Sequence, residues 1–156
     1  AADRNPYSPQ LERCRMEVNI YTTQAVNYWA VLVAAVAYFV LGALWYSPGL
    51  FGKTWRNGVG KTDEQVKADF TPVSLVWTFI MSLLAAYGIA RILSWMHAAS
   101  MAQGLQVGLV AGISFAMATV WMHDAMERRP RSLTVVNSLY SIIGFVVMGL
   151  ILGAWR

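Results

Sequence analysis

Four long apolar stretches dominate the chain, and polar connections separate them. They cover about residues 27–46, 72–96, 104–122 and 134–155. An α-helix needs about 20 apolar residues to cross a hydrocarbon core roughly 30 Å thick, and each stretch approaches or exceeds that length. The pattern therefore predicts an all-α fold, an integral membrane four-helix bundle.

The first stretch ends in aromatic residues around a Ser-Pro-Gly break. Pro48 disfavours helical geometry at Ser47, and Gly49 permits a turn, so the helix is expected to stop there. Aromatic rings at a helix end are typical of the membrane interface. We expect an interfacial anchor formed by Trp45, Tyr46, Pro48, Phe51, Trp55 and Trp155.

The connection between the first two spans is rich in charge. Within residues 52–69, Thr62 and Gln65 have the spacing of a helix capping box, which predicts one short interfacial helix. Pro72 suits the first turn of the second span.

The third connection contains two pairs of opposite charge. Asp124 with Arg128, and Glu127 with Arg131, have the i,i+4 order that supports the end of a helix. Pro130 then forces a turn before the fourth span.

Composition agrees with a membrane protein. The 156 residues are 57% hydrophobic and 13% charged, whereas soluble domains are about 45–50% apolar and 25% charged. The net charge of +4 comes from basic residues in the connections, where lipid headgroups are available, so we expect no nucleic acid partner. The single cysteine, Cys14, excludes an internal disulfide and any Cys-based metal set within one chain.

Lysine and arginine predict the orientation. The connections after spans one and three hold Lys53, Arg56, Lys61, Lys67, Arg128, Arg129 and Arg131. The other side of the domain holds only Arg91 and Arg156. The positive-inside rule then predicts a multi-pass membrane protein with basic connections in the cytoplasm and both termini on the non-cytoplasmic side.

The N-terminal segment differs from the rest. Residues 1–15 lack the apolar core of a secretory signal peptide, so we expect them to form a polar extension and Met16 to begin the membrane domain, residues 16–156. Three arginines of this extension oppose the predicted orientation if they are present during insertion.

The sharpest pattern is a stripe of small residues at four-residue spacing on the third span: Gly104, Gly108, Gly112 and Ala116. Such a face is a groove into which another helix backbone can fit closely. The second span offers a partner ridge of Ser82, Ala86, Ala90 and Ser94, and the fourth adds Gly149 and Gly153. We favour packing within one bundle over a dedicated dimer face.

Few residues can carry chemistry at membrane depth. A polar path formed by Gln106, Asn137, Ser141 and Arg91 is possible, although hydrogen bonding between helices and snorkelling of Arg91 are favoured. His97 and His123 are interpreted as interfacial side chains. The chain has no nucleophile with a base and no metal-ligand set at useful spacing, so we predict no catalytic residue, metal or cofactor.

Two segments carry a family resemblance: NYWAVLVAAVAYFVLGALWYSPGLFGKTW and ERRPRSLTVVNSLYSIIGFVVMGLILGAWR. Over about residues 16–156 the chain resembles the small bacterial membrane proteins of domain of unknown function 1761. The resemblance implies about four membrane helices and a place in the bacterial inner membrane, and it brings no activity or cofactor. The residues that carry it are Gly42, Trp45, Tyr46, Pro48, Phe51, Gly52, Lys53, Arg129, Pro130, Asn137, Tyr140, Gly149, Gly153 and Trp155.

Three classes of function stay open. We favour a non-enzymatic accessory or structural subunit that packs, through its small-residue faces, with a larger membrane complex or with itself. The alternative is a small oligomeric channel or transporter, and a membrane enzyme is the least favoured.

Overall fold

The computed structural model describes residues 25–98 and 100–155, and every regular element among them is helical. Four rods are long and apolar enough to cross a membrane. They are α2 (Tyr28–Trp45), α5 (Pro72–Trp95), a rod of α6 (Met101–Val110), η1 (Ala111–Met117) and α7 (Ala118–Met126), and α8 (Arg131–Ala154). The predicted all-α membrane bundle is confirmed. Residues 1–15, the predicted polar extension, lie outside the described residues.

Side-chain caps set where the spans begin. The Asn27 Oδ1 accepts hydrogen bonds from the backbone N–H groups of Trp29 and Ala30, at 3.1 and 3.2 Å. Thr71 and Ser100 cap α5 and α6 in the same way. These caps satisfy N–H groups that have no partner inside their own helix.

The last two spans are longer than predicted. The third runs from Met101 to Met126 instead of 104–122, because Ser100 caps it early and the polar residues after Met122 continue the helix. The fourth begins at Arg131 instead of 134, directly after Pro130.

The connection between α2 and α5 contains two short helices where one was predicted. They are α3 (Gly52–Val59) and α4 (Asp63–Asp69). Gly60 separates them because its left-handed backbone, with φ of 72°, ends α3. The predicted capping box then starts α4, with Thr62 Oγ1 accepting from Gln65 N–H and Gln65 Oε1 accepting from Thr62 N–H.

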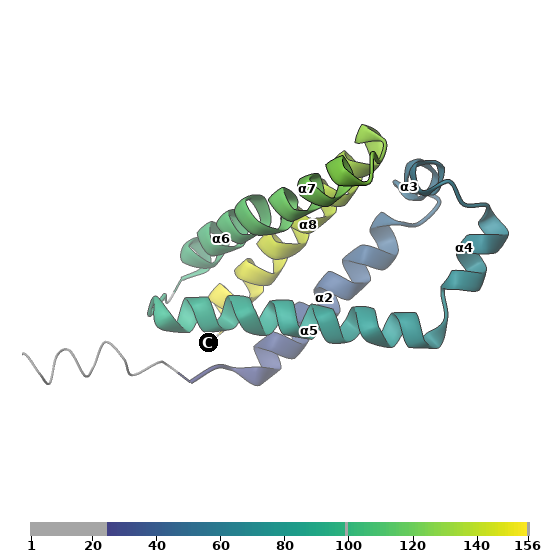
Figure 1. Ribbon diagram of the computed structural model, residues 1–156. Coiled ribbons are helices and arrows are strands. Elements are labelled where there is room, and N and C mark those ends of the chain that lie inside the picture. The colour runs from purple at the N-terminus through teal and green to yellow at the C-terminus, as the bar shows by residue number, and fades with distance from the viewer. Residues whose placement is uncertain (1–24, 99, 156) are drawn as a thin grey trace, which may run out of the picture.

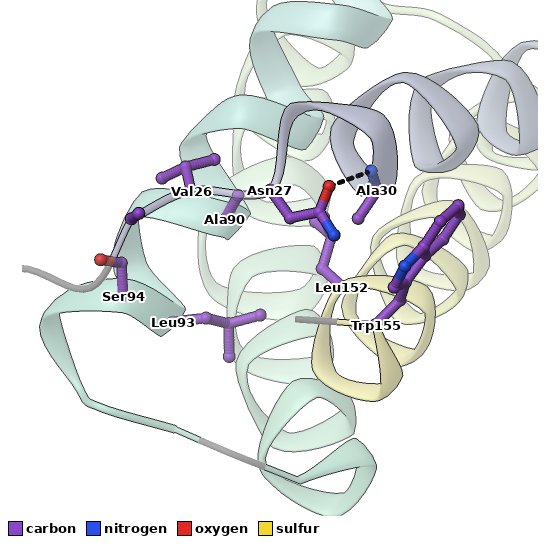
Figure 2. Close-up of a pocket in the computed structure, with 9 residues that line it drawn as sticks. Val26, Asn27, Ala30, Ala90, Leu93, Ser94, Leu152 and Trp155 are labelled. Carbon is purple, nitrogen blue, oxygen red and sulfur yellow. Dashed lines mark hydrogen bonds between the residues drawn. The ribbon is translucent and has the colours of Figure 1, made fainter.

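Helix α8 contacts all the other spanning helices. The α6–η1–α7 rod runs beside it, whereas α5 crosses α2 on the other side of the bundle (Figure 1). The start of α2, the end of α5 and the end of α8 meet around a cavity of about 40 Å³ lined by Asn27, Leu93 and Trp155 (Figure 2). The first span therefore begins at the end of the bundle where the last span finishes.

The closest helix contact joins α6 and α8, where glycines of one helix face glycines of the other. A Cβ added at Gly108 would lie 2.5 Å from the Phe145 carbonyl oxygen, and one at Gly153 would lie 3.0 Å from the Gly104 Cα. Cβ atoms added at Gly104 or Gly149 would each collide with the other residue's carbonyl oxygen. The groove of the small-residue stripe is thus occupied by α8 of the same chain.

The ridge on α5 has a different neighbour from the predicted one. Ser82, Ala86 and Ala90 are buried. Because α5 makes its main contact with α2 and only a small one with α6, this ridge is not the main partner of the glycine groove.

A π-helical segment, η1, interrupts the third span, and the sequence pattern gave no sign of it. Hydrogen bonds in a π-helix run from residue i to i+5 and widen the helix. The four-residue stripe therefore loses its register after Gly112, whose Cβ position lies 2.9 Å from the Ile142 Cα. Ala116, the last predicted member, is only half-buried.

Candidate functional site

The chain folds back sharply at the end of α2. Phe51 N–H donates to the Trp45 carbonyl oxygen at 3.1 Å, and Gly52 N–H donates to that of Ser47 at 3.0 Å. A Cβ at Gly52 would lie 2.6 Å from this Ser47 oxygen, so a side chain has no room there. The helix stops before exposed Pro48, where the sequence predicted it.

The end of α2 is joined to α8 by two hydrogen bonds, each between residues 91 positions apart in the sequence. Trp45 Nε1 donates to the Val136 carbonyl oxygen at 3.2 Å, and Tyr46 Oη donates to Asn137 Oδ1 at 3.0 Å. Burial raises the pKa of the Tyr46 phenol, and nearby Tyr38 raises it further. A phenol is protonated at neutral pH in any case, and both effects keep the Tyr46 hydroxyl a donor at higher pH as well.

Six rings form an aromatic cluster around α8: Tyr38, Trp45, Tyr46, Phe51, Trp55 and Tyr140. The Tyr140 ring is central, with its centroid 5.0 Å from that of Tyr38 and 5.2 Å from that of Tyr46. These separations fall in the range of favourable aromatic pairs. The two segments that carry the family resemblance therefore meet in this cluster.

The cluster changes the interpretation of the predicted anchor. The Trp45 side chain is buried, with 9% of the residue exposed, and Phe51 packs on it with ring centroids 4.5 Å apart. Trp45 contacts Val136 and Tyr140 of α8, so it joins two helices in addition to any contact with headgroups. Trp155, at the opposite end of the bundle, is 48% exposed and fits the predicted anchor better.

A lateral cavity of about 390 Å³ lies between α2, α5 and α8, beside the aromatic cluster. Its lining is mostly apolar: Phe39, Gly42, Ala43, Tyr46, Phe70, Leu75, Thr78 and Tyr140. The three hydroxyl groups donate elsewhere, that of Thr78 to Ser74 O at 2.8 Å and that of Tyr140 to Tyr38 O at 3.4 Å, while that of Tyr46 reaches Asn137. They can still accept hydrogen bonds.

An outer cavity of about 360 Å³ adjoins the lateral cavity, and Tyr46 and Phe70 line both. Charged residues of α3 and α4 line the outer cavity: Arg56, Asp63 and Lys67. Arg56 forms an ion pair with Asp63, and the Arg56 side chain is only 20% exposed. The two cavities together are apolar at one end and carry two cations and one carboxylate at the other.

The residues of the predicted polar path are not brought together. Ser141 Oγ donates to the Asn137 carbonyl oxygen at 3.0 Å, so these two share one turn of α8. Gln106 is exposed on α6 near Gly104, which packs on Gly149, and Gly149 lies about 18 Å along α8 from Asn137 at 1.5 Å per residue. The Arg91 guanidinium lies over the Trp95 ring, 5.3 Å from its centroid.

Sequence reasoning missed most of the lateral cavity. Phe39, Ala43, Leu75 and Thr78 lie in stretches that are apolar on every side, so no periodicity marks one face. Gly42 and Tyr140 were marked only through the resemblance, and Tyr46 was marked as an interfacial anchor and not as part of a cavity. In residues 25–98 and 100–155, no group of three His, Cys, Asp or Glu side chains is placed to hold a metal ion.

Comparisons with known proteins agree with the resemblance. No curated protein and no solved structure matches this chain. The model of one family, described as protein of unknown function (DUF1761), matches residues 29–153. This range is most of the chain and includes all six residues of the aromatic cluster. The chain therefore belongs to the DUF1761 family.

Proposed function

We propose that this protein is a non-enzymatic binding protein of the membrane that holds an amphiphilic molecule between α2, α5 and α8. The apolar body of the ligand occupies the lateral cavity, and an anionic end lies in the outer cavity. The observation that carries this proposal is the junction of the two cavities at Tyr46 and Phe70.

The size and chemistry of the cavities suit such a ligand. Small-molecule sites are mostly apolar and measure about 300–1,000 Å³, and the lateral cavity alone falls in this range. Arg56 and Lys67 can attract a phosphate or carboxylate through charge-assisted hydrogen bonds. Asp63 neutralises Arg56 in part, so the ligand would compete with an existing ion pair.

Three residues of the family resemblance support the same site. Gly42, Tyr46 and Tyr140 all line the lateral cavity. The missing side chain of Gly42 lets the Tyr140 hydroxyl come close, since an added Cβ would lie 2.9 Å from it. These residues form part of the wall of the lateral cavity, and the ring contacts of the aromatic cluster position Tyr46 and Tyr140 in it.

A pair of neighbouring substitutions tests the proposal. Ala43→Phe fills the lateral cavity, whereas Leu44→Phe adds a ring to the outer surface of the same helix, where Leu44 is 58% exposed. Each protein is purified in mild detergent, and amphiphiles that accompany it are quantified by mass spectrometry. We expect wild type and Leu44→Phe to retain the same amphiphile and Ala43→Phe to lose it. Equal retention in all three would refute the proposal.

An accessory subunit is the second candidate, and an apolar groove between α5 and α6 favours it. The groove, about 460 Å³, is lined by Ile92, Met96, Gln106, Val110 and Phe115 among others. The Gln106 amide gains from a hydrogen-bonding partner in apolar surroundings. Because α8 fills the glycine groove of the third span, this second groove is the better place for a helix of another membrane subunit.

Crosslinking tests that candidate. A Val110→Cys protein in a Cys14→Ser background is treated in its native membrane with a short thiol-to-amine crosslinker. A single heavier product that contains a second membrane protein supports the accessory role. If only the uncrosslinked monomer is found, the accessory role is contradicted. If the product is a crosslinked homodimer, the groove binds a second copy of this chain and not another subunit.

The bacterial inner membrane and the predicted orientation form part of the proposal. Seven lysine and arginine residues in the connections after α2 and α7 support cytoplasmic placement of both. Lys61→Cys, again with Cys14→Ser, is expected to resist an impermeant thiol reagent in intact cells and to react after lysis. Labelling in intact cells would reverse the orientation.

A further inference from the structure

A third cavity lies where α7 turns into α8. It measures about 300 Å³, and Trp121, Asp124, Arg128, Arg129, Arg131 and Thr134 line it. It shares no lining residue with the lateral or outer cavity. An inference from this cavity is therefore independent of the proposed function.

The carboxylate in this cavity lacks a partner. Asp124 Oδ2 is buried, and it makes no hydrogen bond with any residue of 25–98 and 100–155. The predicted pairing of Asp124 with Arg128 does not form, because α7 ends at Met126 and the left-handed backbone of Arg128, with φ of 54°, takes this residue out of helical register. A carboxylate oxygen that is enclosed without a donor is unfavourable, so this half-buried side chain points to a positively charged or hydrogen-donating ligand.

Two arginines beside it also lack acceptors. The spacing predicted a pair of Glu127 with Arg131, but Glu127 pairs with Arg129 instead, at 2.8 Å. Arg128 and Arg131 form no ion pair with the described residues. The cavity thus presents two unpaired guanidinium groups and one unpaired carboxylate, and a ligand that satisfies all three must carry both signs of charge.

We propose that this cavity binds the phosphoethanolamine headgroup of a membrane phospholipid. The primary ammonium pairs with the Asp124 carboxylate, and the phosphate accepts from Arg128 and Arg131. An anionic headgroup has no positive charge to offset the negative charge of Asp124 and would be repelled by it, and the hydroxyl groups of phosphatidylglycerol supply only a neutral hydrogen bond. A choline headgroup has no N–H donor, so it would not supply the hydrogen bond that Asp124 lacks.

The surroundings favour a lipid over a free headgroup. The cavity lies at the ends of two membrane-spanning rods, and Trp121 at its rim is 46% exposed, as expected of an interfacial ring. Below Arg131, exposed Val135 and Leu139 follow one face of α8 at four-residue spacing. Acyl chains attached to the phosphate can lie along that face.

Lipid competition tests this inference on the full chain. Wild-type protein is equilibrated in micelles with equal amounts of phosphatidylethanolamine, phosphatidylglycerol and phosphatidylcholine, and bound lipid is measured by native mass spectrometry. We expect phosphatidylethanolamine to exceed each of the others about tenfold, since one charged hydrogen bond contributes about that factor. A wild-type protein without this preference would overturn the proposal.

Substitutions assign the two charges. Asp124→Asn should abolish the preference for phosphatidylethanolamine over phosphatidylglycerol, whereas Glu127→Gln, which changes the carboxylate that is already paired, should preserve it. Arg128→Gly should weaken binding of both lipids, and glycine tolerates the left-handed backbone, so the turn is kept. Unchanged binding in Asp124→Asn and Arg128→Gly would refute the assignment.

A soluble competitor separates the two sources of the headgroup. Free phosphoethanolamine, added at the same concentration as the phospholipid, is expected to leave bound lipid unchanged, because it lacks the acyl chains. Displacement by this compound would show that the cavity binds the free molecule and would overturn the lipid assignment.

Discussion

The contact between α6 and α8 and the contact between α2 and α5 both use small residues, yet they bring their helices together differently. Between α6 and α8, glycine faces glycine and the backbones touch. Between α2 and α5, the buried residues include Ala34 and Ala86, and a pair of larger rings, Phe39 and Phe79, meets with centroids 5.7 Å apart. The first contact leaves no space, whereas the second borders the lateral cavity.

The bundle therefore has a closed half, formed by α6 and α8, and an open half, formed by α2 and α5. In lipid, helices associate through close packing and hydrogen bonds between them, and burial of apolar surface adds little. Within residues 25–98 and 100–155, α6 and α8 make the most extensive helix contact, so these two helices form the rigid pair of the bundle. The helix α5 crosses α2 and diverges towards α4 (Figure 1), which leaves room for a ligand without loosening the rigid pair.

The largest loss of stability is expected when a large side chain replaces a glycine in the contact between α6 and α8. Gly108→Leu would force its side chain into the backbone of Phe145 and Val146, neither of which can rotate away. We expect a loss of about 3 kcal/mol or more in the free energy of unfolding. Reversible unfolding by SDS in mixed micelles, followed by circular dichroism, measures it.

Gly88→Leu is the matched control, because a Cβ at Gly88 of α5 meets nothing within 4 Å. It should be neutral or slightly stabilising, since leucine is a better helix former than glycine. If the monomer of Gly108→Leu were as stable as this control, α8 would not be the occupant of the groove, and the contrast between the two halves would fail.

An intermediate effect is expected at the hydrogen bond that joins α2 to α8. Tyr46→Phe removes the hydroxyl that donates to Asn137 Oδ1 and keeps the ring in the aromatic cluster. We expect a loss of about 1 kcal/mol, within the range for hydrogen bonds between membrane helices. A double-mutant cycle with Asn137→Ala isolates the pair, and strictly additive losses would mean that the bond contributes nothing.

The fold could be predicted well because the length and composition of each apolar stretch are enough to identify it as a membrane-spanning helix. The stop before Pro48 and the capping box of Thr62 are likewise local, since a few neighbouring residues decide them. The break between α3 and α4 was local too, and Gly60 is its signal. Reading the whole charged connection as one helix hid that signal.

The site was less predictable because it depends on which helices meet. The glycine stripe shows that one face is flat, but it does not show whether α5 or α8 lies on it. Tyr46 and Asn137 are 91 residues apart, and neither has a local feature that identifies the other. The lateral cavity depends on the divergence of α5 from α2, which uniformly apolar stretches do not encode in their periodicity.

The smallest effect is expected from Gly42→Ala, which sharpens the comparison between the two halves. The added Cβ would lie 2.9 Å from the Tyr140 hydroxyl, the tip of a side chain, whereas at Gly108 it would meet backbone at 2.5 Å. The ring tip can move by a few tenths of an ångström, and alanine gains about 1 kcal/mol in helix propensity over glycine. The two effects should nearly cancel, leaving the free energy of unfolding within about 0.5 kcal/mol of wild type. Gly108→Ala in the same SDS titration should lose clearly more. Equal losses at both positions would mean that the open half of the bundle is as tightly constrained as the closed half, and that the lateral cavity cannot adapt to a ligand.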